Sequence, residues 1–231
     1  MIVRIGAAPR RPGLSTPEVL EHWRTAHADA AGRIPGLRGY VQYHPVLVDG
    51  VHALGYPGFD ACSELDFDSL AAMDAGFASE VYRRDVVADE QQLVDKERFT
   101  LVLGERHVLA GERGAGRGAR LLTFLRRHPA VSAAELFAAV TGPYAEQVAD
   151  ATTGHEVVRA LDHDRPGREQ QAFDAVDELV FADVATARGW LASEGAVDAA
   201  LALAGLTAGT TRLLAQGVEV VGADDAPGGL A

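Results

Sequence analysis

One histidine, His27, stands out as a residue that could carry acid–base chemistry. A histidine has an unperturbed pKa of about 6.5, so it can take or release a proton near neutral pH. Trp23 lies four residues before His27, and on a helix the two side chains share a face. We therefore expect His27 to be catalytic and Trp23 to bind substrate as an aromatic wall. The alternative is a buried histidine that hydrogen-bonds to the backbone.

A second histidine, His22, lies five residues before His27. On a regular α-helix that spacing separates two side chains by roughly 140°. We therefore expect His22 to face solvent or to pair with Glu18, four residues earlier. The same spacing argues against a metal ion held by both histidines, and the sequence predicts no metal site.

Three polar side chains, Tyr40, Gln42 and His44, alternate along a predicted strand and so share one of its faces, opposite Tyr43. Buried polar groups need partners, so this face either lines a cavity or holds a satisfied network. In a cavity, His44 could be a second acid or base. Tyr40 could donate to a developing oxyanion, and with Gln42 it is a candidate for substrate binding.

Carboxylates supply the remaining candidates. Asp89 could orient a catalytic histidine by fixing its tautomer, and the alternative is a solvated charge at a helix end. Glu64 and Glu178 occupy equivalent positions of an internal repeat described below, which favours a structural role for both.

The elements that must position these residues follow the order β-α-β-β-α-β. A strand covers residues 2–7, and a helix begins at Ser15, whose spacing to Glu18 is that of a capping box, and runs to about residue 31. Strand patterns follow at residues 37–48 and 59–67, and helical stretches follow between 68 and 96. A final strand covers residues 99–109. Residues 119–221 repeat this order.

An internal repeat supports two units. Residues 59–67 recur as residues 173–181 with six of nine identities, and a helix start near Ser15 matches one near Ser132. We expect an α+β fold of two ferredoxin-like units in tandem that form an intramolecular α+β barrel. The expected domains are residues 1–109, a linker at 110–118, a degenerate second unit at 119–222 and a flexible tail at 223–231.

Three motifs carry a resemblance to a known family. They are His22-Trp23 with His27 on the first helix, the turn at residues 35–40 (Pro-Gly-Leu-Arg-Gly-Tyr), and the strand at residues 64–67 (Glu-Leu-Asp-Phe). Residues 1–109 resemble the EthD family of dimeric α+β-barrel proteins. Related barrels include polyketide cyclases, cofactor-free monooxygenases, muconolactone isomerases and heme enzymes of two fused units, so the resemblance implies the fold without fixing the chemistry.

The second unit departs from the motif. At an offset of 117 residues, Val140 replaces Trp23 and Tyr144 replaces His27. We therefore expect one catalytic pocket, in the first unit, and a second unit that closes the barrel. Two alternatives are a degenerate second pocket that uses Tyr144, and a heme held by His155 or His163, which the repeat places in or near a loop.

Composition excludes several classes. The chain of 231 residues has a formal net charge of −12, so a nucleic-acid partner is not expected. Cys62 is its one cysteine, which excludes an intramolecular disulfide and a Cys-rich zinc site. Lys96 is the only lysine, and no Walker-type phosphate loop is present. No targeting or membrane-spanning segment is visible, so we expect a cytoplasmic protein without a membrane partner.

These features predict an enzyme without a tightly bound cofactor. It would move a proton beside a carbonyl of a small hydrophobic, aromatic or polyketide-like compound, in a cyclisation, dehydration or isomerisation. One alternative is a cofactor-independent monooxygenase on the same barrel, and another is a non-catalytic ligand-binding or accessory protein. Because both halves of the barrel are on one chain, the protein is expected to be a monomer or a homodimer.

Overall fold

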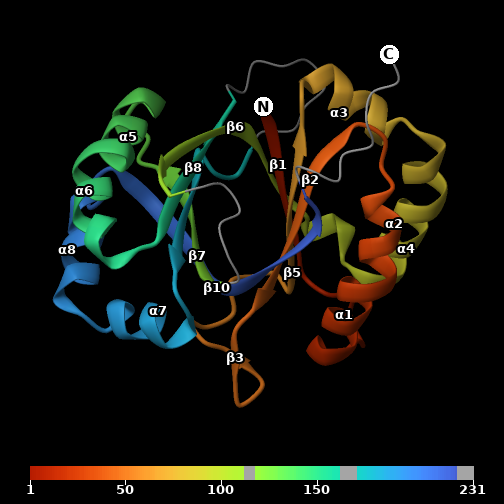
Figure 1. Cartoon of the computed structure of the whole chain (residues 1–231), viewed down its shortest axis with the longest axis horizontal. Coiled ribbons are helices and arrows are strands. Elements are labelled where there is room, and N and C mark those ends of the chain that lie inside the picture. The colour runs from red at the N-terminus through yellow and green to blue at the C-terminus, as the bar shows by residue number, and fades with distance from the viewer. Residues whose placement is uncertain (112–117, 162–170, 223–231) are drawn as a thin grey trace. The chain divides into compact units, whose positions relative to one another are not determined.

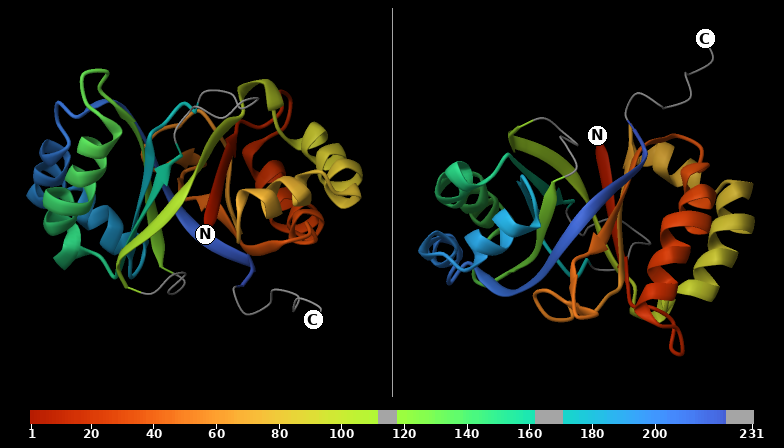
Figure 2. Two further views of the ribbon diagram at one scale, coloured as in Figure 1. Left: turned by 90° about the horizontal axis from the view of Figure 1, so that it is seen from above. Right: turned by 60° about the horizontal axis from the view of Figure 1, so that its bottom comes forward.

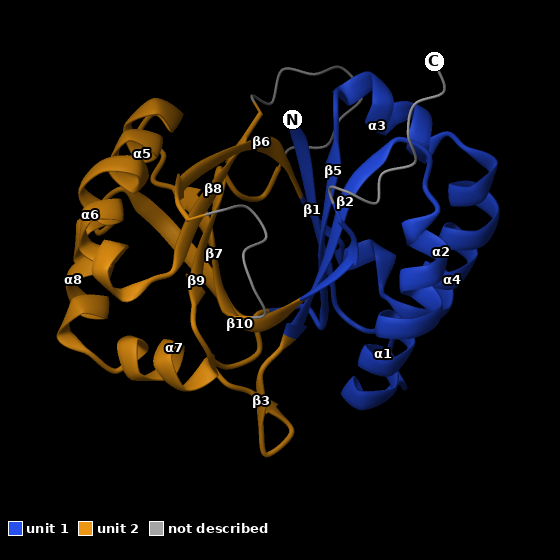
Figure 3. Cartoon of the chain, in the orientation of Figure 1, with its two compact units in different colours: residues 1–44, 58–101, 218–231 blue, residues 45–57, 102–217 orange. Residues whose placement is uncertain are grey.

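The computed structural model describes residues 1–111, 118–161 and 171–222 (Figure 1). The chain divides into two compact units (Figure 3). Unit 1 comprises residues 1–44, 58–101 and 218–231, and unit 2 comprises residues 45–57 and 102–217. These units are discontinuous and so differ from the expected division at residues 109 and 119, which stays a prediction. Most of the expected linker and the whole expected tail lie outside the described residues.

Unit 1 has the expected order of elements. They are β1 (Ile2–Ala8), α1 (Thr16–His22), a π-helical turn (Trp23–His27), α2 (Ala28–Gly32), β2 (Leu37–Pro45), β5 (Ala61–Phe67), α3 (Leu70–Phe77), a second π-helical turn (Tyr82–Val86), α4 (Val87–Leu93), a 3₁₀ turn (Lys96–Arg98) and the start of β6 (Thr100–Ala110).

Unit 2 contains the end of β6 and most of β10. Its elements are a hairpin of β3 (Leu47–Val48) and β4 (Val51–His52), then β7 (Ala119–Arg127), α5 (Ala133–Ala139), a π-helical turn (Val140–Tyr144), α6 (Ala145–Val148), a 3₁₀ turn (Ala149–Ala151), β8 (Gly154–Ala160), β9 (Ala175–Phe181), α7 (Val184–Leu191), α8 (Glu194–Ala202) and β10 (Thr207–Val221).

The main strands form a closed barrel in the order β1-β5-β2-β10-β7-β9-β8-β6. The expected α+β barrel is therefore confirmed, whereas its origin from two tandem copies stays a prediction. In the part of the chain that the structure describes, no helix is long and apolar enough to cross a membrane.

In unit 1, β5 lies between β1 and β2 and pairs antiparallel with both. Directly opposed residues lie on the same face of a sheet, so the pairs Gly6–Ser63 and Tyr40–Leu65 place these four residues on one face. The helices α1, α2 and α4 cover the unit-1 sheet on one side (Figure 2). An apolar cluster that includes Ala8, Val19, Trp23, Ala61 and Leu93 joins these helices to the sheet.

The first helix begins as the sequence predicts. The Ser15 hydroxyl accepts from the Glu18 backbone N–H, and the Glu18 carboxylate accepts from the Ser15 backbone N–H at 2.8 Å. Ser132 and Glu135 form the same capping box in unit 2. Each box satisfies two backbone donors that a helix start leaves unpaired, which fixes where the helix begins.

The expected regular helix to residue 31 is wrong in its middle, where Trp23–His27 form a π-helical turn. A π-turn is wider than an α-turn and is stabilised by its surroundings rather than by local propensity. Here the amide of Gln42, on β2, donates to the Trp23 carbonyl oxygen at 2.6 Å and to the Tyr40 hydroxyl oxygen at 2.8 Å. Gln42 is fully buried and so ties the π-turn to the sheet.

Replacing Gln42 with leucine should lower the melting temperature by several degrees. The change leaves the buried Trp23 carbonyl without its Gln42 donor, which lowers the free energy of unfolding by about 1–3 kcal/mol. For a chain of this size, each kcal/mol lowers the Tm by about 2–4 °C. Circular dichroism melts would measure the shift. The control is Gln92→Leu, since Gln92 is exposed and bonds only the neighbouring Ala88 carbonyl. Equal melting temperatures for the two variants would show that Gln42 does not hold the π-turn.

Candidate functional site

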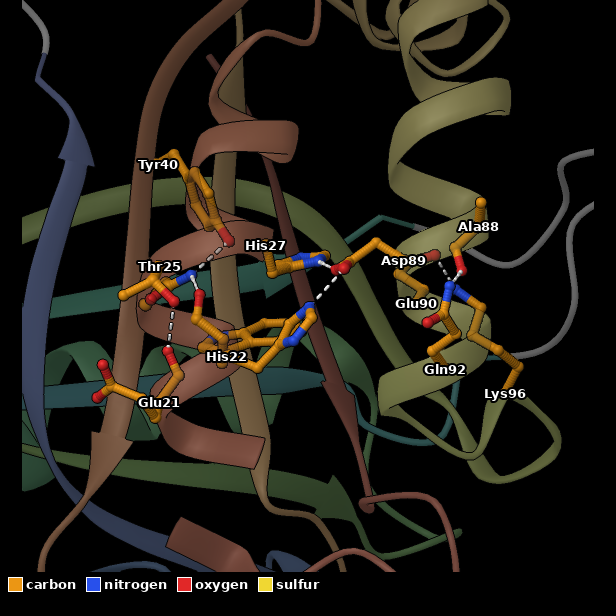
Figure 4. Close-up of polar contacts among 12 residues, drawn as sticks. Glu21, His22, Thr25, His27, Tyr40, Ala88, Asp89, Glu90, Gln92 and Lys96 are labelled. Atoms are coloured by element: carbon orange, nitrogen blue, oxygen red, sulfur yellow. Dashed lines mark hydrogen bonds and ion pairs between the residues drawn. The ribbon is translucent and has the colours of Figure 1, made fainter. Parts of the chain in front are cut away.

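The π-helical turn brings two histidines to one carboxylate. His22 Nε2 lies 2.5 Å from Asp89 Oδ1, and His27 Nδ1 lies 2.7 Å from Asp89 Oδ2 (Figure 4). Asp89 belongs to α4, which packs beside the π-turn. The two imidazoles thus occupy the two oxygens of a single side chain.

The expected pairing of His22 with Glu18 is wrong, because the π-turn brings His22 to Asp89, while the His22 side chain stays 39% exposed to solvent. The 140° separation holds for an α-helix, whereas a π-helix bonds residues i and i+5, so side chains five apart come to nearly the same side. The spacing argument against a shared metal ligand fails for the same reason. Even so, the described residues contain no group of three or more potential ligands that could hold a metal ion.

His27 is buried, with 3% of its surface exposed. An ionised carboxylate only accepts hydrogen bonds, so Asp89 requires the proton of a neutral His27 to sit on Nδ1. The other ring nitrogen, Nε2, has no hydrogen-bond partner among the described residues. The geometry therefore leaves a lone pair on Nε2, as a general base needs.

Trp23 is held against His27, as expected, although the two residues bound a π-helical turn and not the α-helix that the i, i+4 reasoning assumes. The two rings are stacked, with centroids 4.0 Å apart and an angle of 11° between planes. The indole is 5% exposed, and its Nε1 is buried without a hydrogen-bond partner in the described part of the chain. An aromatic wall beside the histidine is thus present, and it carries an unused donor.

A narrow pocket in unit 1 lies beside both rings. It is small, with a cavity volume of about 20 Å³ between the sheet and the helices, and it has an open mouth. Trp23, Leu65, Phe77, Val86 and Phe99 are among its apolar walls. Its polar lining side chains are Arg4, His27, Tyr40, Ser63, Tyr82 and Glu90.

The strand residues expected at the site separate into two groups. Tyr40 lines the pocket, and burial raises its pKa well above the ordinary value, so the hydroxyl stays protonated. Gln42 and His44 do not line it: Gln42 holds Trp23 and Tyr40, and His44 Nε2 lies 3.0 Å from Gln42 Oε1. Burial, then the nearby Arg24 charge, lowers the pKa of His44. The structure thus gives this face both a cavity and a hydrogen-bonded network.

Sequence reasoning missed several pocket residues. Arg4, Tyr82 and Glu90 were not singled out for the site, although Arg4 alternates with Gly6 and Ala8 on the first strand. Glu90 is nearly buried and pairs with Lys96 at 2.5 Å. A charged residue among small ones on a buried strand is a signal that could have found Arg4.

Unit 2 has the same π-turn with different chemistry. The Tyr144 hydroxyl donates to Asp177 Oδ2 at 2.8 Å, and His155 Nε2 lies 2.6 Å from Asp177 Oδ1. Burial, then the Asp177 charge, raises the pKa of Tyr144 well above its usual value. His155 is the second residue of β8, close to the preceding loop, and is 2% exposed.

The geometry disfavours the expected alternative of a heme held by His155, because that residue is 2% exposed and its Nε2 is bonded to Asp177. His163 lies outside the described residues.

Replacing Asp89 with asparagine should cost stability in a pH-dependent way. Burial raises the pKa of Asp89, but the hydrogen bonds from His27 and His22 outweigh burial and hold the pKa below its ordinary value. A carboxyl whose folded pKa is depressed stabilises the fold above its unfolded pKa, about 3.9, and loses that contribution as pH falls through the folded pKa. Urea melts should show the largest wild-type advantage over Asp89→Asn near neutral pH and a shrinking one below pH about 4. An advantage independent of pH would contradict this ionisation.

Comparisons with known proteins agree with this fold. The structure aligns with an anthrone oxidase-like protein at a TM-score of 0.66 and 15% identity, covering 100% of this chain and 96% of the other. A suggested monooxygenase from Lactobacillus acidophilus NCFM aligns at a TM-score of 0.56 and 13% identity, and the alignment covers 95% of this chain and 94% of the other. A suggested chlorite dismutase aligns at 0.54 and 10% identity, covering 97% of each chain. At these identities the likeness concerns the fold.

No curated protein matches the sequence. The sequence model of the EthD domain matches residues 11–97, which include His22, Trp23, His27 and Asp89. The resemblance carried by the sequence motifs is thereby confirmed for this part of the chain. This part of the chain is therefore similar to the EthD domain family.

Proposed function

We propose that unit 1 is a small-molecule enzyme in which His27 is the general base and Asp89 orients it. The observation that carries the proposal is the pair of His27 nitrogens: Nδ1 is bonded to Asp89, and Nε2 has no partner among the described residues and belongs to a residue that lines the pocket. A carboxylate behind the imidazole fixes the tautomer and stabilises the imidazolium that forms when Nε2 takes a proton.

The reaction class follows from what this pair can do. His27 Nε2 takes a proton from a carbon next to a carbonyl, the C–H electron pair moves toward the carbonyl oxygen, and an enolate forms. The imidazolium returns the proton at another atom, which gives an isomerisation, or protonates a departing hydroxyl, which gives a dehydration; attack of the enolate on a second carbonyl gives a cyclisation. None of these steps changes the overall oxidation state, so none needs a redox cofactor.

The substrate class follows from the walls. Trp23, Phe77 and Phe99 present aromatic surface, and Leu65 and Val86 add aliphatic surface. Such walls favour a flat hydrophobic compound, because burying apolar area contributes about 25 cal/mol per Å². An aromatic or polyketide-like ketone has both the shape and the acidic C–H that the proposal requires.

Oxidation by dioxygen on the same barrel is the second candidate. The aligned proteins named as anthrone oxidase-like and as a suggested monooxygenase favour it. An enolate formed at His27 is the electron-rich species that dioxygen would meet, so both candidates share the first step. Oxygen consumed in proportion to product would select the second candidate, and turnover under argon would select the first.

We propose that unit 2 is a second copy of unit 1 that has lost the catalytic site and has a structural role. Its Tyr144 and His155 both bond the buried Asp177, and a tyrosine takes the place that His27 has in unit 1. A matching capping box and a matching π-turn in the two units support the duplication.

The general-base role predicts a loss of proton transfer in His27→Ala. Exchange of the C2 hydrogens of 1-tetralone and of the C10 hydrogens of anthrone in D₂O, followed by proton NMR, measures this step without knowledge of the natural substrate. The variant should be slower by roughly 10²–10⁴-fold, the usual contribution of a positioned acid–base group. The control is His128→Gln in unit 2, where His128 is exposed.

Equal exchange by wild type and His27→Ala would contradict the assignment. Ketones that bind without any exchange in the wild type would indicate a ligand-binding protein instead.

The scaffold role predicts that Tyr144→Phe separates stability from activity. The change removes a donor to the fully buried Asp177, so the melting temperature should fall. Exchange at 25 °C should stay within about twofold of wild type, since unit 1 is untouched. A large loss of exchange in the folded variant would instead indicate that Tyr144 takes part in the reaction.

A further inference from the structure

The indole of Trp23 has a donor that the fold does not use. Its Nε1 is buried and has no hydrogen-bond partner in the described residues, although Trp23 lines the pocket. Leaving a buried N–H unpaired is costly, so such groups in a native structure call for an explanation. A bound ligand that carries an acceptor oxygen would supply the missing partner.

The position of this donor ties it to the proposed base. The indole is stacked on the His27 ring with centroids 4.0 Å apart, and Gln42 bonds the Trp23 carbonyl. The indole and the imidazole are therefore fixed together, and a ligand beside one lies beside the other. A donor adjacent to the base is suited to the oxygen on which charge develops as the base removes a proton.

A positive charge lines the same pocket. Arg4, on β1, is the only arginine or lysine among the lining residues, and its guanidinium carbon lies 4.6 Å from the centroid of Phe77 and 5.2 Å from that of Phe99. A Cβ at Gly6 would lie 2.8 Å from Phe99 Cζ and 3.2 Å from Arg4 Nη1, so glycine leaves room for this arrangement. Glu90, which also lines the pocket, is paired with Lys96.

We infer that this pocket binds a flat ketone through its carbonyl oxygen, which accepts from Trp23 Nε1–H, and that Arg4 stabilises the negative charge the oxygen gains. The inference rests on the proposed function and names the residues that hold the carbonyl oxygen of its substrate. In the step, His27 Nε2 takes the α-proton, the C–H bond breaks, and its electron pair becomes the carbon–carbon double bond of an enolate. The carbonyl π-pair moves to the oxygen, whose hydrogen bond from Trp23 shortens.

Indole NMR tests the contact directly. The chain has two tryptophans, so Trp190→Phe assigns the Trp23 Nε1–H signal. Titration with 1-tetralone should move the Trp23 proton downfield, and titration with tetralin, which has the same rings without oxygen, should not. Equal shifts with both compounds, or no shift with 1-tetralone up to its solubility limit, would overturn the inference.

Two substitutions separate the donor from the charge. β-(3-Benzothienyl)alanine at position 23 keeps the ring shape and replaces N–H with sulfur. Affinity for 1-tetralone should therefore fall roughly 3- to 10-fold, the contribution of one hydrogen bond, while affinity for tetralin should not fall.

Arg4→Met should slow α-hydrogen exchange by roughly 10- to 100-fold with little change in affinity, because the negative charge on the oxygen exists only once the proton moves. Arg83→Met, at an exposed arginine, is the control.

The outcomes are independent of the test of His27. Unchanged affinity for 1-tetralone in the benzothienyl variant would remove Trp23 as the donor, and an Arg4→Met defect in affinity alone would remove the role of Arg4 in charge stabilisation. A downfield indole shift in a protein whose His27→Ala variant still exchanges would keep the binding mode and discard the proposed base.

Discussion

The site depends on one carboxylate shared by two histidines. Asp89 accepts at both oxygens, from His22 at 2.5 Å and from His27 at 2.7 Å, and these bonds join α4 to the first helix. Both bonds require the π-helical turn, since a regular helix would turn the histidines apart. The π-helical turn depends on Gln42, whose amide donates to the Trp23 carbonyl oxygen from the neighbouring strand. The sheet therefore sets the helix geometry, and the helix geometry sets the tautomer of His27.

Unit 2 shows what the same backbone does with other side chains. Tyr40 in unit 1 and His155 in unit 2 sit at equivalent register positions, opposite Leu65 and Leu179. Asp177 stands in the repeat where unit 1 has the smaller Ser63, which lines the pocket. The larger acid fills that place and bonds both His155 and Tyr144. A buried hydrogen-bonded cluster of this kind fixes the side chains that take part in it.

Much of the fold could be predicted from local signals. Capping boxes at Ser15 and Ser132, strand alternation and the repeat give the element order, because they depend on neighbours in sequence. His27, Trp23 and Asp89 could be singled out by residue type and resemblance.

The π-turn could not be predicted, since its cause is Gln42, 19 residues downstream of Trp23. His22 was misplaced for that reason alone, and Arg4 was missed because its aromatic partners, Phe77 and Phe99, come from distant segments.

The central claim is that Asp89 keeps the proton of neutral His27 on Nδ1 and leaves Nε2 as the base. Long-range proton–nitrogen NMR of imidazole-labelled protein measures this tautomer directly, with His27→Gln to assign the signals. The account predicts the Nδ1–H tautomer in the wild type and a shift toward Nε2–H in Asp89→Asn, whose amide can donate to Nδ1. A wild-type His27 protonated on Nε2, or a tautomer unaffected by Asp89→Asn, would contradict it.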